Sequence, residues 1–363
     1  MCMEFKSVVE EQIIQGVVHD IHVSEPVVYV DNQARNRSGH MSHAMVELSD
    51  GRIIDFNSNC SAERYFGHTP FGWIEYRYSD DGGASFGDVY DLPYTKQVFD
   101  DGIMTISVEK AVLCDDGTLI AFCLRNNAAL ERHFCEPWAT PMYVRSTDGG
   151  ATWTKEAELS PYPGRTYGAI NQNGTIYVLH FCNERFRGRD PEHLYRLYKS
   201  TDNGKHFFEE SVVDFGNTFG LGYGSLTFMA DGRLVAYAQD LNAPEYLRYA
   251  ISNDNGKSWC EIGKSYVKYG AINPQINVLD GQYIMHGRSA FACDLVLYTS
   301  KDGLHWDEGH ILNPKKQSSG CFYSNNVIAH GYGKQGKDHM IVQFSESYYS
   351  SCVNAMHIMI ESC

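Results

Sequence analysis

The chain has 363 residues, of which 43% are hydrophobic and 13% aromatic, and its formal net charge is −15. This composition is typical of an ordered globular protein and excludes a disordered or fibrous chain. The negative charge argues against nucleic acid or an anionic membrane as a partner, because both are bound through clustered Lys and Arg. An acidic ligand would therefore need a local pocket of arginines.

The sequence contains no apolar run of about 18 residues that would span a membrane, and it opens with MCMEFKSVVEEQ, which lacks the order of a secretion signal. Its eleven cysteines include no CxxC pair and favour reduced thiols over a disulfide framework or a zinc site. We therefore expect a cytoplasmic protein, or a secreted one if a leader was removed. We expect no catalytic cofactor and no metal among the site residues, while a structural Ca²⁺ and the oligomeric state are left open.

Six pairs of apolar, strand-like segments follow one another along the chain. A tight turn such as SDG, DDG or NQNG joins the segments of the first five pairs, and the loop 332–337 joins those of the sixth. The pairs begin at His43, Glu109, Tyr167, Tyr223, Pro274 and Tyr323. If each pair supplies the inner strands of one β-propeller blade, six pairs predict six blades.

A shorter motif of the form SxDxGxxW/F recurs between these pairs. Its Asp side chain can accept hydrogen bonds from the amides of its own turn, and its Gly supplies a positive φ. Five copies recur at intervals of 67, 54, 52 and 48 residues, and they open at Ser79, Ser146, Ser200, Ser252 and Ser300. This period is typical of a four-stranded propeller blade. The fifth copy is one residue short between Asp302 and Trp306, which predicts a tighter turn.

Both patterns predict an all-β fold, a six-bladed β-propeller with four-stranded antiparallel blades. The opening segment QIIQGVVHDIHV and the final segment VNAMHIMIE are both β-rich. We expect them to complete the last sheet from both ends of the chain, which closes the ring and leaves no exposed edge. We therefore expect residues 1–363 to form a single domain.

The SxDxGxxW/F motif is an Asp box, and its repetition at blade spacing resembles the sialidase (neuraminidase) superfamily over nearly the whole chain. The resemblance implies an exo-acting glycosidase with a tyrosine nucleophile, a glutamate that assists it, an aspartate acid/base and three arginines that hold the sugar carboxylate. Similar propellers also serve other glycosidases, polysaccharide lyases and glycan-binding modules. The partner that the resemblance implies is a glycan with a terminal acidic sugar.

The resemblance assigns the nucleophile to Tyr323, which opens the last inner strand and is followed by Ser324, as in the family. A neutral phenol is a weak nucleophile and needs a base or a cation nearby. Tyr223 stands near the place of the family glutamate. Glu109, which heads the second inner strand and could face the channel, is the candidate catalytic carboxylate.

The acid/base position departs from the family pattern, because His68 lies near the place of the expected aspartate. His43 opens the first inner strand, two residues after Met41, which is near the place of the first family arginine. Histidine can transfer protons at neutral pH without burial. His68 and His43 are therefore the acid/base candidates.

The arginine clamp also departs from the family pattern. Met41 and Gln239 are near two of the expected arginine positions, and Arg288 lies near the third. Other arginines lie at blade ends, where the loops of one propeller face converge. The candidate substrate-binding residues are Arg64, Arg125, Arg165, Arg288, Gln239, Tyr167 and Tyr223, the two tyrosines being able to stack on a sugar ring.

Three functions are consistent with these residues. The favoured one is a retaining, sialidase-like exo-glycoside hydrolase that forms a covalent intermediate at Tyr323. The second is a polysaccharide lyase, in which His43 or His68 acts with a tyrosine on a uronate to give an unsaturated product. The third is a propeller that binds glycans without turnover.

Overall fold

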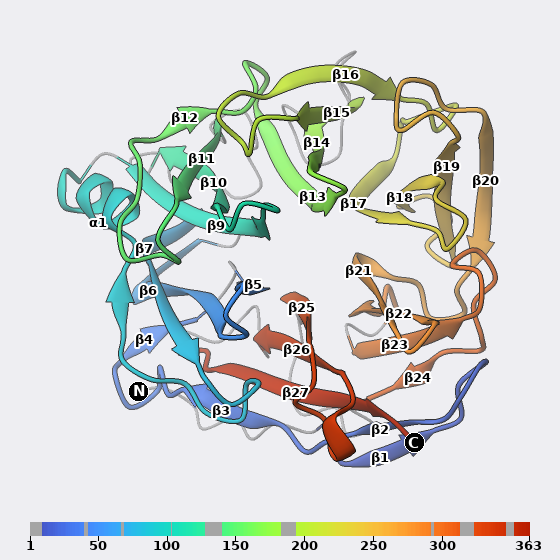
Figure 1. The fold of residues 1–363 in the computed structure, drawn as a ribbon, viewed down its shortest axis with the longest axis horizontal. Helices are drawn as coiled ribbons and strands as arrows, with labels where there is room; N and C mark the ends of the chain where they lie inside the picture. The colour runs from blue at the N-terminus through green and yellow to red at the C-terminus, as the bar shows by residue number, and fades with distance from the viewer. Residues whose placement is uncertain are drawn as a thin grey trace.

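The computed structural model describes residues 9–39, 43–66, 69–102, 104–127, 140–182, 194–291, 294–312, 323–345 and 352–363. Within them, six antiparallel sheets stand around a central axis as the blades of a propeller (Figure 1). The predicted fold class is confirmed. Four sheets have four strands, whereas the first has five and the last has six.

Blades 1 to 3 follow the chain from its N-terminal third. Blade 1 contains β4 (Arg37–Ser38), β5 (His43–Glu47), β6 (Ile53–Phe66), β7 (Thr69–Ser79) and β8 (Tyr90–Asp91). Blade 2 contains β9 (Met104–Leu113), β10 (Leu119–Asn127), β11 (Thr140–Ser146) and β12 (Ala157–Glu158). Blade 3 contains β13 (Gly164–Gln172), β14 (Thr175–Cys182), β15 (Leu194–Ser200) and β16 (Phe208–Val213).

Blades 4 to 6 complete the ring. Blade 4 contains β17 (Leu221–Phe228), β18 (Leu234–Asp240), β19 (Tyr246–Ser252) and β20 (Glu261–Tyr266). Blade 5 contains β21 (Ile272–Leu279), β22 (Gln282–Arg288), β23 (Leu295–Ser300) and β24 (His310–Ile311). Blade 6 contains β25 (Tyr323–Ala329), β26 (His339–Ser345), β27 (Ala355–Ser362), β1 (Gln12–Ile14), β2 (Ile21–Val23) and β3 (Val27–Val30).

Blade 6 is built from both ends of the chain, as the sequence predicted. Strands β2 and β3 both pair with the C-terminal strand β27, and β1 extends the sheet outward from β2. Figure 1 shows the N-terminal strands β1, β2 and β3 lying alongside β27 at this blade. The loop between β25 and β26 carries the short 3₁₀ helix η2 (Lys334–Gly336), in the place of a tight turn.

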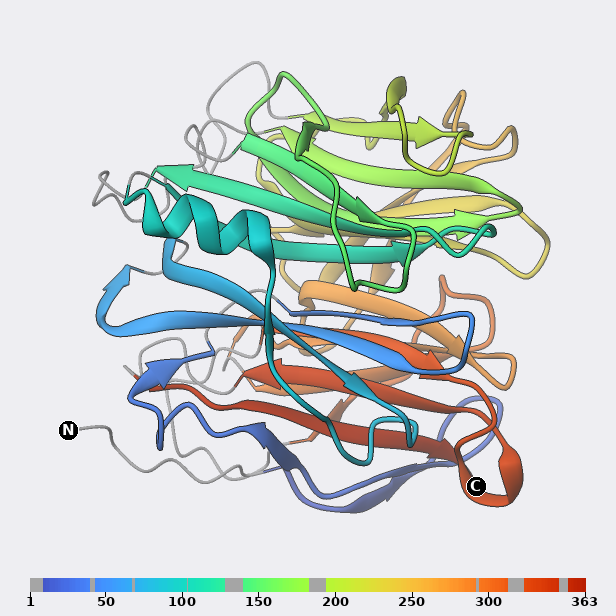
Figure 2. The same ribbon diagram turned by 60° about the vertical axis from the view of Figure 1, so that its left-hand side comes forward.

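The helix α1 (Pro93–Asp100) is an element that the sequence patterns did not indicate. It begins at a proline, which is favoured in the first turn because its missing N–H would have no partner there. It lies against β7 and β9, on the outside of the ring (Figure 2). The helix therefore covers the junction of blades 1 and 2.

The Asp boxes form the turns that follow the third strand of blades 1 to 5. In the box of blade 4, Ser252 Oγ accepts the Gly256 N–H at 2.8 Å and donates to Asp254 Oδ1 at 2.8 Å. In the fifth box the glycine comes one position earlier, and Gly303 N–H donates to Ser300 Oγ at 2.9 Å. The predicted tighter turn is confirmed.

Hydrophobic cores lie between neighbouring blades. Among the described residues, six clusters of buried side chains are found, and each joins one blade to the next around the ring. The cluster between blades 6 and 1 is the smallest of them and consists of Met45, Ile53, Val327, Ala329 and Ile341. The closing interface therefore has less apolar packing than the other five.

The state of the cysteines agrees only in part with what the composition predicted. Six of the described cysteines are free, but Cys352 is disulfide-bonded, so the expectation of reduced thiols is wrong at that position. The cytoplasmic location that rested on it stays a prediction. No described helix has the length and apolar character to cross a membrane.

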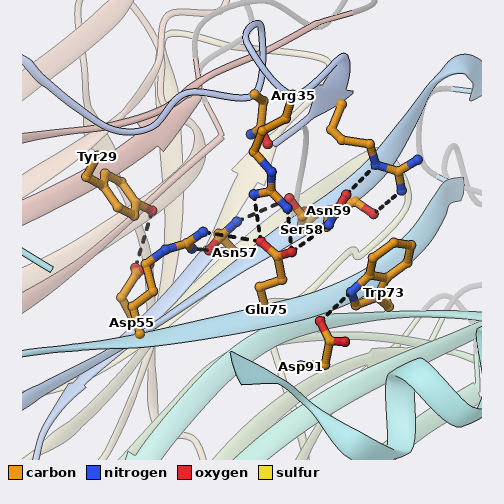
Figure 3. A network of polar contacts seen from close by, with 12 residues as sticks. Tyr29, Arg35, Asp55, Asn57, Ser58, Asn59, Trp73, Glu75 and Asp91 are labelled. Atoms are coloured by element: carbon orange, nitrogen blue, oxygen red, sulfur yellow. Dashed lines mark hydrogen bonds and ion pairs between the residues drawn. The ribbon is translucent and has the colours of Figure 1, made fainter. Parts of the chain in front are cut away.

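A buried polar network supplements the small core between blades 6 and 1 (Figure 3). Asp55 on β6 accepts hydrogen bonds from Tyr29, at 3.3 Å, and from Gln343 on β26. Arg77 on β7 donates to Asn57 on β6. Burial raises the pKa of the Asp55 carboxyl to about 7, and the charge of Arg77 limits the rise.

The raised pKa of Asp55 predicts a pH-dependent stability. Its pKa is ordinarily 3.8, so between about pH 4 and pH 7 the folded state keeps a proton that the unfolded chain has lost. Stability should therefore fall as the pH rises through this interval, by at most about 1.4 kcal/mol per pH unit. Asp55→Asn keeps the accepting oxygen but cannot ionise, so it should flatten this decline in thermal unfolding measured across the interval.

The matched control is Asp50→Asn. Asp50 is exposed; desolvation raises its pKa, but the hydrogen bonds from the backbone and side chain of Arg52 together lower the pKa below 3.8, so it titrates below the interval. This variant should keep the wild-type slope. If wild type and Asp55→Asn lost stability with pH in parallel, the raised pKa of Asp55 would be contradicted.

Candidate functional site

A central pocket opens among the inner strands of blades 2, 3, 5 and 6. Its cavity volume is about 40 Å³. Its lining residues are Val108, Glu109, Lys110, Arg165, Thr166, Tyr167, Asn273, Gln275, Tyr323, Ser324 and Asn325. Four of the residues selected from sequence, Glu109, Arg165, Tyr167 and Tyr323, therefore lie in one cavity.

Irregular pairing of the inner strands places several of these side chains. In β9 the register passes from Val108 to Lys110 and skips Glu109. Equivalent shifts skip Tyr167 in β13 and Tyr223 in β17. Such β-bulges re-aim a side chain, and here they allow the consecutive residues Glu109 and Lys110 both to line the pocket.

Tyr323 is buried at the start of β25 and has polar and cationic neighbours. Its hydroxyl lies 3.3 Å from the hydroxyl of Tyr223. The guanidinium carbon of Arg288 lies 5.4 Å from the centre of its ring, within the range of a cation–π interaction. The ring centres of Tyr223 and Tyr167 are 5.6 Å apart, so Tyr223 contacts Tyr323 through its hydroxyl and Tyr167 through its ring.

Glu109 and Arg165 form a buried ion pair between blades 2 and 3. Arg165 Nε donates to Glu109 Oε1 at 2.7 Å, and Arg165 Nη2 donates to the same oxygen. The other oxygen, Oε2, accepts the backbone N–H of Thr166 at 2.8 Å. Each carboxylate oxygen of Glu109 is therefore engaged by blade 3.

Lys110 is a pocket cation that the sequence analysis missed. Its ammonium donates to Gln275 Oε1 on β21 and to Asn325 Oδ1 on β25, the latter at 3.3 Å. Burial lowers the pKa of Lys110 to about 8, and the nearby Glu109 carboxylate limits the fall. The ammonium is therefore mainly charged at neutral pH. The sequence signal for this cation was the charged pair Glu109–Lys110 within an apolar strand. Regular strand alternation, however, predicts that only one of the two side chains faces the pocket.

The other candidates lie apart from this constellation or outside the described residues. Gln239 is buried on β18 opposite Gly222 and does not line the central pocket. Arg125 lies beside Tyr94 of α1 and is not among the residues that line the central pocket. The backbones of His43 and Arg64 lie in β5 and β6, but their side chains are outside the described residues, as is the whole of His68.

Two arginines precede the first inner strand, upstream of the position at which the sequence analysis sought one. Arg35 donates to both oxygens of Glu75, at 2.9 and 2.6 Å, and Arg37 donates to the carbonyl of Asn59 at 2.9 Å (Figure 3). The guanidinium of Arg37 also lies 4.9 Å from the ring of Trp73. These contacts hold the segment before β5 against blade 1.

Comparison with known proteins agrees with this architecture. The family model described as "BNR repeat-like domain" matches residues 161–327. A search of curated proteins gave no match. A protein of unknown function from Dyadobacter fermentans superposes with a TM-score of 0.73 at 14% identity, over 94% of this chain and 99% of that one.

Two sialidases have the same fold. A Hadza microbial sialidase superposes with a TM-score of 0.67 at 12% identity, over 92% of this chain and 68% of its own. The chain thus shares its Asp-box propeller fold with that sialidase. A Trypanosoma rangeli sialidase, in complex with 2,3-difluorosialic acid as a covalent intermediate, superposes with a TM-score of 0.59 at 13% identity. There the propeller covers 92% of this chain and 54% of the other, so it spans about half of that protein.

The Glu109–Arg165 ion pair predicts that losing Arg165 alone lowers the free energy of unfolding more than losing both charges together. Arg165→Met removes the guanidinium that pairs with the buried Glu109 carboxylate, and should lower the free energy of unfolding by about 3–5 kcal/mol. Adding Glu109→Gln removes the unpaired charge and should restore much of this loss. Urea unfolding of the wild type, both single variants and the double variant measures the coupling.

Arg233→Met is the matched control, because Arg233 pairs with the exposed Asp231. That substitution should cost less than about 1 kcal/mol. If the effects of Arg165→Met and Glu109→Gln simply added, the two side chains would not form the energetic unit that their contacts indicate.

Proposed function

We propose that this propeller is an exo-acting, retaining glycoside hydrolase that releases a terminal acidic sugar, sialic acid or a related one, from glycans. The observation that carries the proposal is the environment of Tyr323. This phenol lies in the central pocket, with the hydroxyl of Tyr223 at 3.3 Å and the guanidinium of Arg288 beside its ring. A cation beside the ring favours the charge that develops on the phenol oxygen as it becomes a nucleophile.

The charge of the pocket supports an anionic substrate. Its described lining residues include the cations Lys110 and Arg165 and a single carboxylate, that of Glu109, and Arg288 lies beside Tyr323. The chain as a whole has a net charge of −15, so this local excess of positive charge is opposite in sign to the rest of the protein. Such a local field concentrates an anionic ligand.

In the proposed reaction the Tyr323 O–H loses its proton to solvent, its oxygen bonds to the anomeric carbon, and the bond from that carbon to the leaving oxygen breaks. An acid protonates the leaving oxygen, and His68 or His43 is proposed for this role. Water then attacks the anomeric carbon of the glycosyl-enzyme and gives a proton to the same histidine, while the bond to Tyr323 breaks and the Tyr323 oxygen takes up a proton from solvent. The superposed Trypanosoma rangeli sialidase, solved as a covalent intermediate, supports this two-step route.

Glu109 has a positioning role in this proposal rather than that of a proton acceptor. Its oxygens accept hydrogen bonds from Arg165 and from the Thr166 N–H, and these bonds favour the ionised, weakly basic carboxylate. The pair holds the Arg165 guanidinium at the wall of the pocket. The hydroxyl of Tyr223 is placed to donate to the Tyr323 oxygen when that oxygen carries negative charge.

The direct test compares wild type with Tyr323→Phe on fluorogenic glycosides of sialic acid, related nonulosonic acids and uronic acids. The substitution removes only the nucleophilic oxygen, so release should fall by at least about a thousandfold. Tyr177→Phe is the control, because Tyr177 is equally buried but lies in β14, away from the pocket lining. It should keep wild-type activity.

The other outcomes discriminate between the remaining functions. An unsaturated, ultraviolet-absorbing product from a uronate polymer would establish a lyase in place of the hydrolase. Binding without release from any of these glycosides would indicate a glycan-binding propeller.

A further inference from the structure

A chain of hydrogen bonds with one fixed direction runs beneath the pocket. The Val278 backbone N–H, which can only donate, lies 2.9 Å from Asn277 Oδ1 and so fixes the orientation of that amide. Asn277 Nδ2 must then donate to Asn326 Oδ1, at 2.9 Å. Asn326 Nδ2 in turn faces His286 Nε2 at 2.8 Å and can only donate to it.

This chain determines the protonation of His286. Because Nε2 accepts, the imidazole is neutral and carries its proton on Nδ1, which lies 3.0 Å from Ser324 Oγ. Burial, together with the positive charge of Lys110, lowers the pKa of His286 to about 3, in agreement with a neutral ring. Ser324 Oγ therefore accepts from His286, and its own O–H is left to donate. Ser324 lines the pocket, and His286 is the only hydrogen-bond partner of its hydroxyl within the described part of the chain.

The acceptors of Lys110 are fixed in the same way. Gln275 Nε2 donates to the carbonyl of Asn273 at 3.3 Å, so Oε1 is the atom that faces Lys110. The Asn326 N–H donates to Asn325 Oδ1 at 2.9 Å, so this oxygen also accepts from Lys110. Lys110 thus donates two of its three N–H groups to neutral amides, and no carboxylate among the described residues forms an ion pair with it.

Lys110 lies at the inner end of the pocket. Together with Gln275 and Asn325 it also lines the adjoining cavity of the central channel. An ammonium removed from water is stabilised chiefly by a charged partner. The nearest candidate, Glu109, is paired with Arg165.

We propose that Lys110 and Ser324 form the subsite that binds the carboxylate of the acidic sugar, in the place of an arginine clamp. The third ammonium N–H and the Ser324 O–H are both donors, and a carboxylate supplies two acceptors and the missing negative charge. This deepens the proposed function by naming the groups that recognise the substrate. It concerns binding alone and does not depend on turnover.

The test is isothermal titration calorimetry with two free sugars, N-acetylneuraminic acid and glucuronic acid, and the methyl ester of each. Esterification removes the charge and keeps the rest of the sugar. Wild type should bind at least one acid more tightly than its ester. Lys110→Met should raise the Kd of that acid by about ten- to a hundredfold, and Ser324→Ala by about fivefold, with the Kd of the ester nearly unchanged.

Lys264→Met is the control, because Lys264 is an exposed residue of β20 on the outside of the ring. It should leave both Kd values unchanged. Equal affinity of wild type for acid and ester, or no binding of either acid, would overturn the proposal even if Lys110→Met did not fold. Acid-selective binding that Lys110→Met abolishes, in a protein that cleaves no glycoside, would support this subsite and reject the hydrolase.

Discussion

Closure of the ring between blades 6 and 1 is the constraint on which the pocket depends. The pocket lining comes from four inner strands, β9, β13, β21 and β25, and these surround a common space only when the ring is complete. Blade 6, which supplies Tyr323, is itself assembled from both ends of the chain. The interface that closes the ring has the smallest apolar cluster of the six among the described residues, and it adds the buried hydrogen bonds of Asp55 and Gln343.

Within that frame, β-bulges adapt a regular propeller to a binding site. In a regular strand only alternate side chains face the pocket, whereas bulges at Glu109, Tyr167 and Tyr223 each insert one extra residue into the inner strands of blades 2, 3 and 4. The result is a pocket in which an ion pair, tyrosine side chains and an ammonium group meet around Tyr323. Met41 and Gln239 stand near two positions where the resemblance led us to expect arginines. The pocket has other hydrogen-bond donors instead, among them Lys110 and Ser324.

The sequence predicted the fold well because its signals are local. The Asp box and the inner strand pairs each span few residues, and their repetition determined the number of blades. It also selected Tyr323, Glu109 and Arg165, which the structure brings together. It missed Lys110 and His286, because the bulge at Glu109 and the long-range amide chain leave no periodic pattern. His43, His68 and Arg64, whose side chains are outside the described residues, stay predictions.

The central claim is that Tyr323 is a covalent nucleophile, and intact-protein mass spectrometry after incubation with 2,3-difluorosialic acid tests it most directly. The account predicts a mass increase of one glycosyl unit, located by peptide mapping on Tyr323 and absent from Tyr323→Phe. Sugar release by Tyr323→Phe at the wild-type rate, or an adduct on another residue of the wild type, would contradict the account.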